Sequence, residues 1–549
     1  MNQDALAAAI RAYEKDLPRT KRKQSGIYYT PEDVSDCVVR NAIAGYIWSS
    51  LGHQFPGNAN PPPLAPFLAQ ASDQDLNLVW TAVEQIHVLD PACGAGALLC
   101  KACEILLEIK TLVMQAMKGE PPSDGWREQI SSNNIFGIDS LPSAIEVCRL
   151  RLRQWAREDL AIESDVLSLI SIENNVVVAN TLLKFPKSKT FLKILDAGGF
   201  DVVVANPPYG DILTDEEKEA IAGWETGGIR EIAANFIERI LQIMHVGGHM
   251  GLIIANAIAI NQRTAPVRDL IRKHLSECRM ALFGTRPGRL FADAEIRAML
   301  LWGERNDPAT RGETGVIYTT DARKFFQRDR STALESLSFE STAGLELGAH
   351  AIGDGIADTA LPKVGFPTIR QILLKLRDQS AILVGDRINK PGYQEILTLR
   401  ATGGYWLTAL EQFPYSSTKL HSIFLETPLE RDFLLLLVNS SLFYLFWSTY
   451  SNLRDFKIND MLKFPFPVFD TLAHQAELIY ELAQRLSSSL LQTFENLRGR
   501  RGGRRGEFHP GQCLDMVHQV DDFVCAVYGL TEADAGFIKN YDNHLRKPK

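Results

Sequence analysis

The stretch DVVVANPPYGD, residues 201–211, contains the pattern that decides the fold. Residues 201–205 predict a buried strand, because Val202 to Ala205 is an uninterrupted apolar run. Pro207 and Pro208 end that strand, since proline has no N–H for a sheet ladder and restricts the residue before it. The sequence therefore predicts a rigid polar loop at the carboxyl end of a buried strand, where open α/β sheets place their ligands.

This loop has the chemistry to hold a planar nitrogen. The amide oxygen of Asn206 and the carbonyl of Pro207 are two adjacent acceptors, and Tyr209 adds an aromatic face. Two acceptors beside a flat face suit a planar amine. An isolated Asn-Pro-Pro sequence is also found in ordinary strand-ending turns, so both interpretations stay open at this point.

Composition sets the frame for this loop. A chain of 549 residues with 45% hydrophobic and 23% charged residues predicts an ordinary globular protein of roughly two to four domains. The net charge of −8 does not indicate a nucleic-acid binder, although a basic cleft can lie on an acidic body. Eight cysteines without disulfide-scaffold density indicate a reducing compartment. Cys100 and Cys103 lack a second Cys or His pair at zinc spacing, so no metal site is predicted.

One segment raises the question of a membrane. Residues 433–450 form a run of eighteen uncharged residues, which is long enough for a candidate span. Asn439-Ser440-Ser441 interrupts the run in its middle, and the N-terminus has no signal-peptide pattern. We therefore expect a pair of core helices here and no membrane contact.

A second pattern lies upstream of the loop. Residues 86–90 (IHVLD) predict a buried strand, residues 91–96 (PACGAG) a glycine turn, and residues 97–110 an apolar helix. This order is typical of a nucleotide-cofactor site, because glycines allow close backbone approach and the helix N-terminus offers free amides. The turn matches neither GxGxxG nor a phosphate loop. Asp90, which opens the turn, suits a ligand with a positive centre better than a pyrophosphate.

The third pattern is a short strand that ends in a carboxylate. Residues 135–139 (IFGID) place Asp139 at the carboxyl end of the strand. An acid at the end of the second strand typically accepts hydrogen bonds from ribose hydroxyls. Each of the three patterns alone is weak evidence, but their order and spacing together predict one α/β fold with a cofactor site.

The three motifs DPACGAG (Asp90 to Gly96), FGID (Phe136 to Asp139) and NPPY (Asn206 to Tyr209) together resemble the amino-group DNA methyltransferases that use S-adenosylmethionine. GIYYTP, residues 26–31, resembles the family's segment at the methionine end of the cofactor. LFADA, residues 290–294, resembles the segment whose aromatic residue packs against the extruded base. The order of the segments is that of the gamma-class N6-adenine DNA methyltransferases, including the methylating parts of type IIG restriction enzymes.

The resemblance implies a fold, a cofactor and a substrate. The fold would be a doubly wound, Rossmann-like α/β methyltransferase domain at residues 1–340, followed by a mixed target-recognition domain with C-terminal helices at residues 341–549. The cofactor would be S-adenosylmethionine, and the substrate an adenine flipped out of double-stranded DNA. The setting would be the cytoplasm of a bacterium or archaeon, in restriction-modification or phage defence.

The resemblance also assigns site residues. The implied catalytic residues are Asn206, Pro207, Pro208 and Tyr209. Tyr209 and Phe291 would stack on the flipped base. The implied cofactor-binding residues are Tyr29, Thr30, Pro31, Asp90, Pro91, Ala92, Gly94, Gly96, Asp139, Asn180 and Asn206.

Asn180 departs from the family pattern. The strand at residues 176–178 ends at Asn180-Thr181-Leu182, where the family more often carries Asp against the cofactor's adenine. An Asn side chain donates as well as accepts, so the contact would survive with altered geometry. Elsewhere, Asn rather than Ser at position 206 favours adenine over cytosine N4 as the target. The chain has no Pro-Cys dipeptide, which excludes cytosine C5 chemistry of the family type.

The region after about residue 345 is expected to carry most of the DNA recognition. Six residues have suitable chemistry, although any of them can equally cover a surface: Arg400, Tyr405, Trp406, Tyr415, Lys419 and Arg454. Two basic clusters, RTKRK at 19–23 and RGRRGGRR at 498–505, stand out. The glycines in the second cluster predict a mobile loop, either for phosphate contact or as a solvated connector.

Three hypotheses remain. The first is a sequence-specific adenine DNA methyltransferase. The second is a methyltransferase of protein glutamine or RNA, which about 200 residues after the catalytic domain make less fitting. The third is a non-catalytic recognition subunit with the same fold. Only about 25 residues precede the first cofactor motif, too few for a nuclease domain, so cleavage would belong to a separately encoded restriction endonuclease or defence protein.

Overall fold

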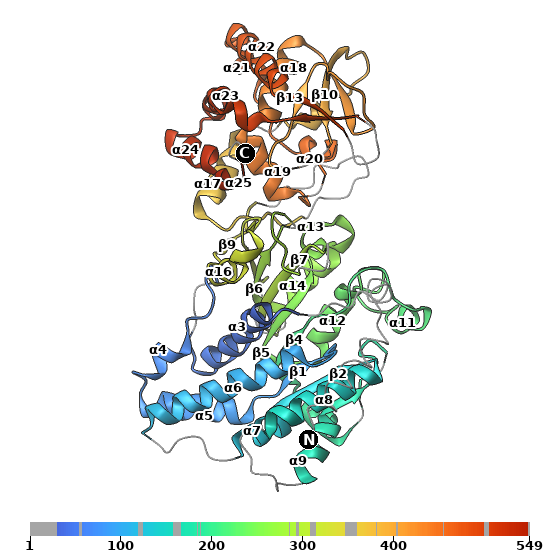
Figure 1. The fold of residues 1–549 in the computed structure, drawn as a ribbon, viewed down its shortest axis with the longest axis vertical. Coiled ribbons are helices and arrows are strands. Elements are labelled where there is room, and N and C mark those ends of the chain that lie inside the picture. The colour runs from blue at the N-terminus through green and yellow to red at the C-terminus, as the bar shows by residue number, and fades with distance from the viewer. Residues whose placement is uncertain are drawn as a thin grey trace. The chain divides into compact units, whose positions relative to one another are not determined.

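The computed structural model divides into two compact units, Met1–Ser341 and Thr342–Lys549 (Figure 1). Each unit has its own hydrophobic core. The division lies close to the boundary expected at residue 340, whereas the role of the second unit in target recognition stays a prediction. The structure describes residues 30–53, 57–118, 125–157, 166–183, 185–186, 188–284, 286–291, 296–307, 314–345, 360–379, 382–401, 404–453, 455–498 and 504–546.

The first unit is built on a nine-stranded sheet with the order β3-β2-β1-β4-β5-β7-β6-β8-β9. Strands β3, β2, β1, β4 and β5 pair in parallel, and β7 is antiparallel to both β5 and β6. The strands are β1 (Val88–Asp90), β2 (Ile135–Asp139), β3 (Val176–Val178), β4 (Phe200–Ala205), β5 (Met244–Ala255), β6 (Leu275–Leu282), β7 (Ala298–Arg305), β8 (Val316–Thr319) and β9 (Glu340–Ser341). The predicted strands at 135–139 and 176–178 are confirmed, and those at 86–90 and 201–205 are confirmed with shifted starts.

The strand order reverses between β1 and β4. From β1 the chain proceeds to β2 and β3 on one side, and from β4 it proceeds to β5 on the other. Val88 pairs with Val202 and Leu89 pairs with Val203, so the carboxyl ends of β1 and β4 lie next to each other. Such a switch point is where open α/β sheets bind ligands. Asp90 is the last residue of β1, and Asn206 directly follows β4.

Helices cover both faces of this sheet (Figure 1). Val202, Val204 and Ile253 belong to the core that α3 and α6 complete, whereas α12 and α14 contact β5 and β6. The helices and helical turns of the unit are α3 (Glu32–Ser50), α4 (Leu64–Leu68), α5 (Asp73–Gln85), α6 (Ala97–Ala116), α7 (Trp126–Gln129), η1 (Ile130–Asn134), α8 (Pro142–Ala156), α9 (Val166–Asn175), α10 (Lys189–Asp196), α11 (Asp215–Ala220), α12 (Ile232–Ile243), α13 (Ala257–Ile260), η2 (Gln262–Thr264), α14 (Ala265–His274), η3 (Gln327–Asp329) and α16 (Arg330–Glu335). The expected doubly wound α/β fold is confirmed.

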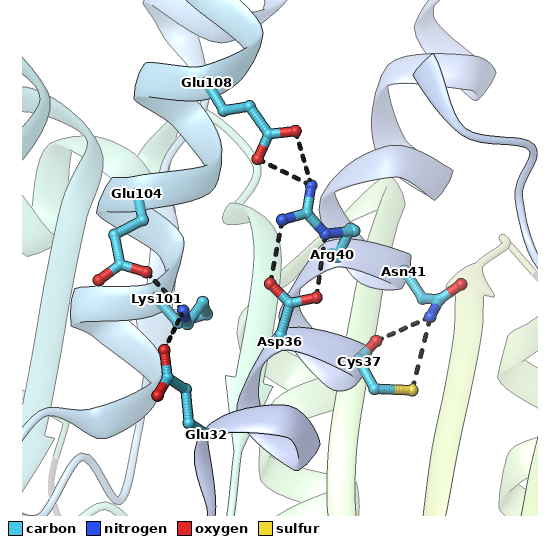
Figure 2. Close-up of polar contacts among 8 residues, drawn as sticks. All are labelled: Glu32, Asp36, Cys37, Arg40, Asn41, Lys101, Glu104 and Glu108. Carbon is cyan, nitrogen blue, oxygen red and sulfur yellow. Dashed lines mark hydrogen bonds and ion pairs between the residues drawn. The ribbon is translucent and has the colours of Figure 1, made fainter. Parts of the chain in front are cut away.

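Polar contacts hold α3 beside α6 (Figure 2). Arg40 on α3 donates to both oxygens of Glu108 on α6, at 3.1 and 3.0 Å, and to Asp36 at 3.0 Å. Lys101 on α6 contacts Glu32 at 3.3 Å, at the start of α3. The first residues of α3 follow Thr30-Pro31, and α6 follows the glycine turn. These largely exposed contacts therefore connect the two helices that follow predicted cofactor segments.

The second unit packs around two central helices, α18 (Pro428–Asn439) and α19 (Ser441–Tyr450). A three-stranded sheet has the order β11-β10-β12, and β13 pairs with β14 as an antiparallel hairpin. The other elements are α17 (Pro367–Gln379), η4 (Val384–Asp386), β10 (Glu395–Arg400), β11 (Ala409–Leu410), β12 (Leu420–Leu425), α20 (Ile458–Leu462), α21 (Phe469–Ala473), α22 (Ala476–Gln492), β13 (Phe494–Arg498), β14 (Arg504–Phe508), η5 (Pro510–Cys513), α23 (Leu514–Val527), α24 (Glu532–Asn540) and α25 (Asn543–Arg546).

The apolar run at 433–450 forms the expected pair of core helices. Its residues are buried, and Ser440 caps α19 by accepting from the N–H of Phe443 at 3.1 Å. Within the described ranges, no single helix has the length and apolarity to cross a membrane. The pair α18 and α19 reaches that threshold only together, with a bend of 68° between them.

The basic cluster at 498–505 differs from its prediction. Arg498 ends β13 and Arg504 begins β14, and these two residues pair with each other across the hairpin. The expected mobile loop is therefore wrong for residues 498, 504 and 505, while residues 499–503 lie outside the described part, as do the first basic cluster at 19–23 and Arg454. Packing of Phe494 against Phe508 and Tyr415 explains the strand, because a packed aromatic face stabilises extended backbone.

Candidate functional site

The NPPY loop leaves β4 at the switch point, and its asparagine is held on both sides. Asn206 Nδ2 donates to Thr30 Oγ1 at 3.0 Å, while Asn206 Oδ1 accepts from the Tyr209 hydroxyl at 2.8 Å. The Tyr209 hydroxyl also lies 3.2 Å from the carbonyl of Ile253 on β5. Both partners are hydroxyls, which donate as well as accept, so they hold the Asn206 side chain in place without dictating which end of its amide is oxygen. A carbonyl oxygen has two lone pairs, so Oδ1 keeps one acceptor site beyond the Tyr209 contact.

The end of the loop is anchored to the start of α12. Gly210 has φ of 95°, a conformation that favours glycine, and its N–H donates to Glu231 Oε1 at 2.8 Å. The carbonyl of Gly210 in turn accepts from the N–H of Ile232 at 3.1 Å. Burial raises the pKa of the Glu231 carboxyl, against the opposing effect of its backbone hydrogen bonds. The loop is thereby held at both ends.

The glycine turn after β1 is tied to the end of β2. The N–H of Cys93 donates to the carbonyl of Ile138 at 2.9 Å, and the N–H of Gly94 donates to Asp139 Oδ2 at 2.9 Å. Gly96 has φ of 83°, and a Cβ on it would lie 2.7 Å from Cys148 Sγ. Only glycine fits at this position, so the turn runs close over α8.

Two carboxylates lie at this edge, and both are costly to ionise there. Asp90 is 2% exposed, and burial raises the pKa of its carboxyl to about 8, with the nearby Asp139 adding to the rise and the Ala92 N–H opposing it. Burial also raises the pKa of Asp139, against three backbone N–H donors. A bound positive charge would favour the ionised forms of both. The carboxylates of Asp90 and Asp139 therefore fit a ligand that carries a positive charge and ribose hydroxyls.

Asn180 lies at the end of β3 and contacts a carboxylate from outside the predicted motifs. Its Nδ2 donates to Glu217 Oε1 at 2.7 Å, and its Oδ1 accepts from the N–H of Leu182 at 3.0 Å. Thr181 Oγ1 donates to the carbonyl of Pro91 at 2.6 Å. The segment after β3 is therefore joined to the glycine turn, as its predicted cofactor role requires.

The two residues predicted to stack on the base are largely buried, and a third predicted site residue, Tyr29, lies outside the described residues. Phe291 is 3% exposed within the core of the first unit, and the carbonyl of its neighbour Leu290 accepts from Arg330 at 3.2 Å. Tyr209 is 8% exposed. Stacking of Tyr209 and Phe291 on a base stays a prediction.

Two contacts to the predicted segments have no signal in the sequence: Glu217 holds Asn180, and Arg330 joins Asp33 to Leu290. Asn256, directly after β5, has a buried Nδ2 with no hydrogen-bond partner among the described residues. Thr214-x-x-Glu217 is a visible capping-box pattern, but a cap does not reveal a contact with β3. No group of three or more His, Cys, Asp or Glu side chains among the described residues has metal-binding geometry.

Comparison with known proteins agrees with this geometry. Residues 133–283 match the Eco57I restriction-modification methylase family. The matched region runs from the strand that carries Asp139, through the NPPY loop, to the end of β6.

The sequence identity to individual curated relatives is below 30%. The type II restriction enzyme and methyltransferase RM.BcgI of Heyndrickxia coagulans is 24% identical over 193 residues, which cover 35% of this chain and 24% of that protein. The type II methyltransferase M.BanIII of Aneurinibacillus aneurinilyticus is 20% identical over 329 residues, which cover 59% of this chain and 46% of that protein. The chain spans less than half the length of the curated relatives it matches.

Among solved structures, the type IIL restriction-modification enzyme MmeI in complex with DNA has a TM-score of 0.55 at 12% identity, over 97% of this chain and 81% of that chain. This likeness concerns the fold alone. The matched family, its curated relatives and the strand order agree with the resemblance of the three motifs. The similarity to the Eco57I restriction-modification methylase family is therefore carried by residues 133–283.

Proposed function

We propose that this protein is a site-specific DNA methyltransferase that transfers the methyl group of S-adenosylmethionine to the N6 amine of a flipped-out adenine. The observation that carries the proposal is the position of the Asn206 side chain at the end of β4. Its amide is held by Thr30 and Tyr209, and its oxygen keeps an acceptor site beside the carbonyl of Pro207. This acceptor lies at the strand switch point next to Asp90, where a cofactor is expected.

The chemistry follows from positioning. The exocyclic amine of adenine is a poor nucleophile because its lone pair is delocalised into the ring. Acceptors at Asn206 Oδ1 and the Pro207 carbonyl would hold both amine hydrogens and localise the nitrogen lone pair. When bound, S-adenosylmethionine supplies a methyl group on a positively charged sulfur. Orientation and electrostatics then suffice, without a strong general base.

The proposed cofactor contacts use the residues at the ends of β1, β2 and β3. Asp90 would face the ammonium group, Asp139 would accept from the ribose hydroxyls, and Asn180 would face the adenine. Thr30 and Pro31 would border the methionine end, together with the backbone of the glycine turn. The raised pKa of Asp90 supports this assignment, because a carboxylate that is costly to ionise gains most from a cationic ligand.

The proposed substrate is double-stranded DNA, from which the target base is flipped at a cost of a few kcal/mol. Stacking on Tyr209 and Phe291, at about 1–3 kcal/mol per base, would offset much of that cost. Similarity to MmeI, which was solved in complex with DNA, supports DNA over RNA or protein. The proposed partner is a restriction endonuclease or defence protein that acts at the same sequence.

The decisive test is incubation with labelled S-adenosylmethionine and unmethylated genomic DNA, followed by modified-base sequencing. We expect label in DNA, as N6-methyladenine at one recognition sequence. Label in protein or RNA but not in DNA would favour the second hypothesis. Cofactor binding without transfer to any polymer would favour a non-catalytic subunit.

A substitution tests the role of Asn206. We expect Asn206→Ala to keep cofactor binding and lose transfer, because the acceptor for the amine is removed. Single-turnover transfer and calorimetric binding of S-adenosylhomocysteine measure the two effects. Asn540→Ala, at an exposed helix position, is the matched control. Transfer by Asn206→Ala within tenfold of the unaltered protein, about 1.4 kcal/mol of barrier, would contradict the acceptor role.

A further inference from the structure

The side-chain amide of Asn180 has one defined orientation. Its nitrogen donates to Glu217 Oε1 at 2.7 Å, and its oxygen accepts from the N–H of Leu182 at 3.0 Å. An ionised carboxylate can only accept and a backbone N–H can only donate, so both contacts select the same orientation. The ability of Asn to present either group outward is thereby removed.

Glu217 is itself firmly placed. It is 8% exposed, and its other oxygen accepts from the N–H of Thr214 at 2.7 Å. Thr214 Oγ1 accepts in return from the N–H of Glu217 at 3.2 Å, which completes a capping box on α11. The capping box at the start of α11 therefore holds the Glu217 carboxylate that accepts from Asn180.

An apolar cluster begins two residues after Asn180. It is formed by Leu182, Leu213, Ile221, Ile232 and Phe236, and the partly buried Ala92 of the glycine turn packs against it together with Ile212 and Trp224. Thr181 Oγ1 donates to the carbonyl of Pro91 at 2.6 Å, which keeps the turn close to Asn180. Partly exposed apolar side chains beside one oriented acceptor suit a purine ring that carries an exocyclic amine.

We propose that Glu217 is a positioning residue that makes Asn180 select the exocyclic amine of the methyl donor's adenine. This inference rests on the proposed use of S-adenosylmethionine. Because Nδ2 is turned toward Glu217 and spends one of its two hydrogens there, Asn180 presents the second lone pair of Oδ1 as the acceptor for the adenine amine. The Asn180–Glu217 pair then acts as the single aspartate that the family more often carries at this position.

The test compares two ligands that differ only at the base. S-adenosylhomocysteine carries the exocyclic amine, and its deaminated analogue S-inosylhomocysteine carries a carbonyl oxygen in its place. We expect the unaltered protein to bind the adenosyl compound at least roughly tenfold more tightly by calorimetry, since a mismatched acceptor pair leaves buried groups unpaired. In Glu217→Gln the side chain at position 217 can donate as well as accept, so only the Leu182 N–H still selects the orientation of the Asn180 amide. The preference is then expected to fall below about threefold.

Two further variants separate amine selection from a structural role. Thr214→Val removes the hydroxyl of the capping box but keeps the charge at position 217, and we expect it to lower stability without changing the ligand preference. Asn180→Asp combined with Glu217→Gln presents a carboxylate directly, and we expect it to regain the adenosyl preference. This double variant also carries the test if Glu217→Gln alone does not fold, since loss of the preference in it would overturn the inference.

The outcomes distinguish the inference from the function on which it rests. An unchanged ligand preference in Glu217→Gln, or an equal fall in Thr214→Val, would overturn the role of Glu217 and leave the proposed methyltransferase intact. No binding of S-adenosylhomocysteine to the unaltered protein would overturn the proposed function, and the inference with it.

Discussion

At the scale of single residues, hydrogen bonds hold the side chains of the two asparagines of the site, Asn206 and Asn180, in place. Asn206 is fixed by Thr30 and Tyr209, and Asn180 is fixed by Glu217 and Leu182. In both cases a residue from a distant part of the chain holds the amide, and at Asn180 the carboxylate of Glu217 also decides which way the amide points. An amide that is fixed before the ligand arrives loses little entropy on binding, which is the physical basis of preorganisation.

Thr30 tests this preorganisation. We expect Thr30→Val to slow methyl transfer roughly tenfold, because Asn206 Nδ2 loses its partner while the shape of the site is kept. Single-turnover kinetics at saturating cofactor measure the effect. Thr111→Val, which removes a hydroxyl bonded to the carbonyl of Leu107 within α6, is the matched control and is expected to transfer at the unaltered rate. Equal rates for the two variants would contradict a positioning role for Thr30.

Asp90 makes cofactor binding depend on pH. Its carboxyl pKa of about 8 means that the group is largely neutral in the ligand-free protein near pH 7, whereas a cationic ligand favours the ionised form. We expect Asp90→Asn to bind S-adenosylhomocysteine more weakly. The ratio of the two dissociation constants, Asp90→Asn over the unaltered protein, should grow by up to roughly tenfold per pH unit as pH rises from about 6 to about 8. Calorimetry of both proteins at each pH removes the titration of the ligand itself, which is common to both.

Ionisation of the Asp90 carboxyl favours binding of a cationic ligand but lowers the stability of the ligand-free protein. A carboxyl whose pKa is raised in the folded protein costs stability as pH rises from its ordinary value of 3.8 to about 8. Asp90→Asn is therefore expected to raise the Tm relative to the unaltered protein at pH 8, with a much smaller gain near pH 4. A gain that is equal at both pH values, or that is larger at the lower pH, would contradict the burial of an ionisable Asp90.

At the scale of elements, the cofactor segments are joined through their helices. Arg330 on α16 donates to both oxygens of Asp33 on α3, at 2.7 and 2.8 Å, and to the carbonyl of Leu290 at 3.2 Å. The side chains of Arg330 and Asp33 are 20% and 21% exposed. This ion pair connects the residues that follow Thr30-Pro31 with the segment that carries Phe291, two motifs that lie far apart in the sequence.

Arg330 and Arg40 form a matched pair for testing these links. We expect Arg330→Gln to lower the free energy of unfolding by about 1–3 kcal/mol and to weaken binding of S-adenosylhomocysteine, because the bonds it removes are largely shielded from water. Arg40→Gln removes contacts to Asp36 and Glu108 in which all three side chains are 38–48% exposed, so we expect its effect on the free energy of unfolding to be at most about 1 kcal/mol. Denaturant unfolding and calorimetry measure the two effects. Equal losses in free energy of unfolding and in binding for the two variants would contradict a link through Arg330.

At the scale of the whole molecule, the chain is acidic overall but carries local basic segments. The net charge is −8, whereas residues 498–505 contain five arginines. Arg498 and Arg504 pair across the β13–β14 hairpin. A hairpin presents its backbone in a fixed register, so basic residues on it are placed at defined spacing instead of on a free loop. We therefore predict that this hairpin contacts DNA phosphates.

Salt dependence measures how many phosphates the hairpin neutralises. We expect replacement of Arg498, Arg504 and Arg505 by Gln to weaken DNA binding and to reduce the slope of log affinity against log salt by about 0.9 for each phosphate that is no longer neutralised. Lys273→Gln, an exposed cation paired with Glu225 in the first unit, is the control and is expected to leave the slope unchanged. An unchanged slope in the triple variant would identify the hairpin as a connector.

Much of the fold was predictable, because its signals are local. The apolar runs at 135–139 and 176–178 have the bounds that their sequence predicts, and Asn439-Ser440-Ser441 divides two buried helices as expected. The arginine cluster at 498–505 was not predictable in the same way. Its glycines and charges indicate a loop, but packing of Phe494 against Tyr415 makes the flanking residues extended. Tertiary packing there overrides local preference.

The sequence by itself determined the order of strand ends and the residue types at each of them: Asp90, Asp139, Asn180 and the NPPY loop. These follow from hydrophobic patterning and from proline and glycine, which act within a few residues. Only the tertiary structure decided which way the amide of Asn180 points and what the amide of Asn206 contacts, since their partners Glu217 and Thr30 lie 37 and 176 residues away in the chain. Hydrogen-bond direction depends on contacts that folding creates, and no local pattern encodes it.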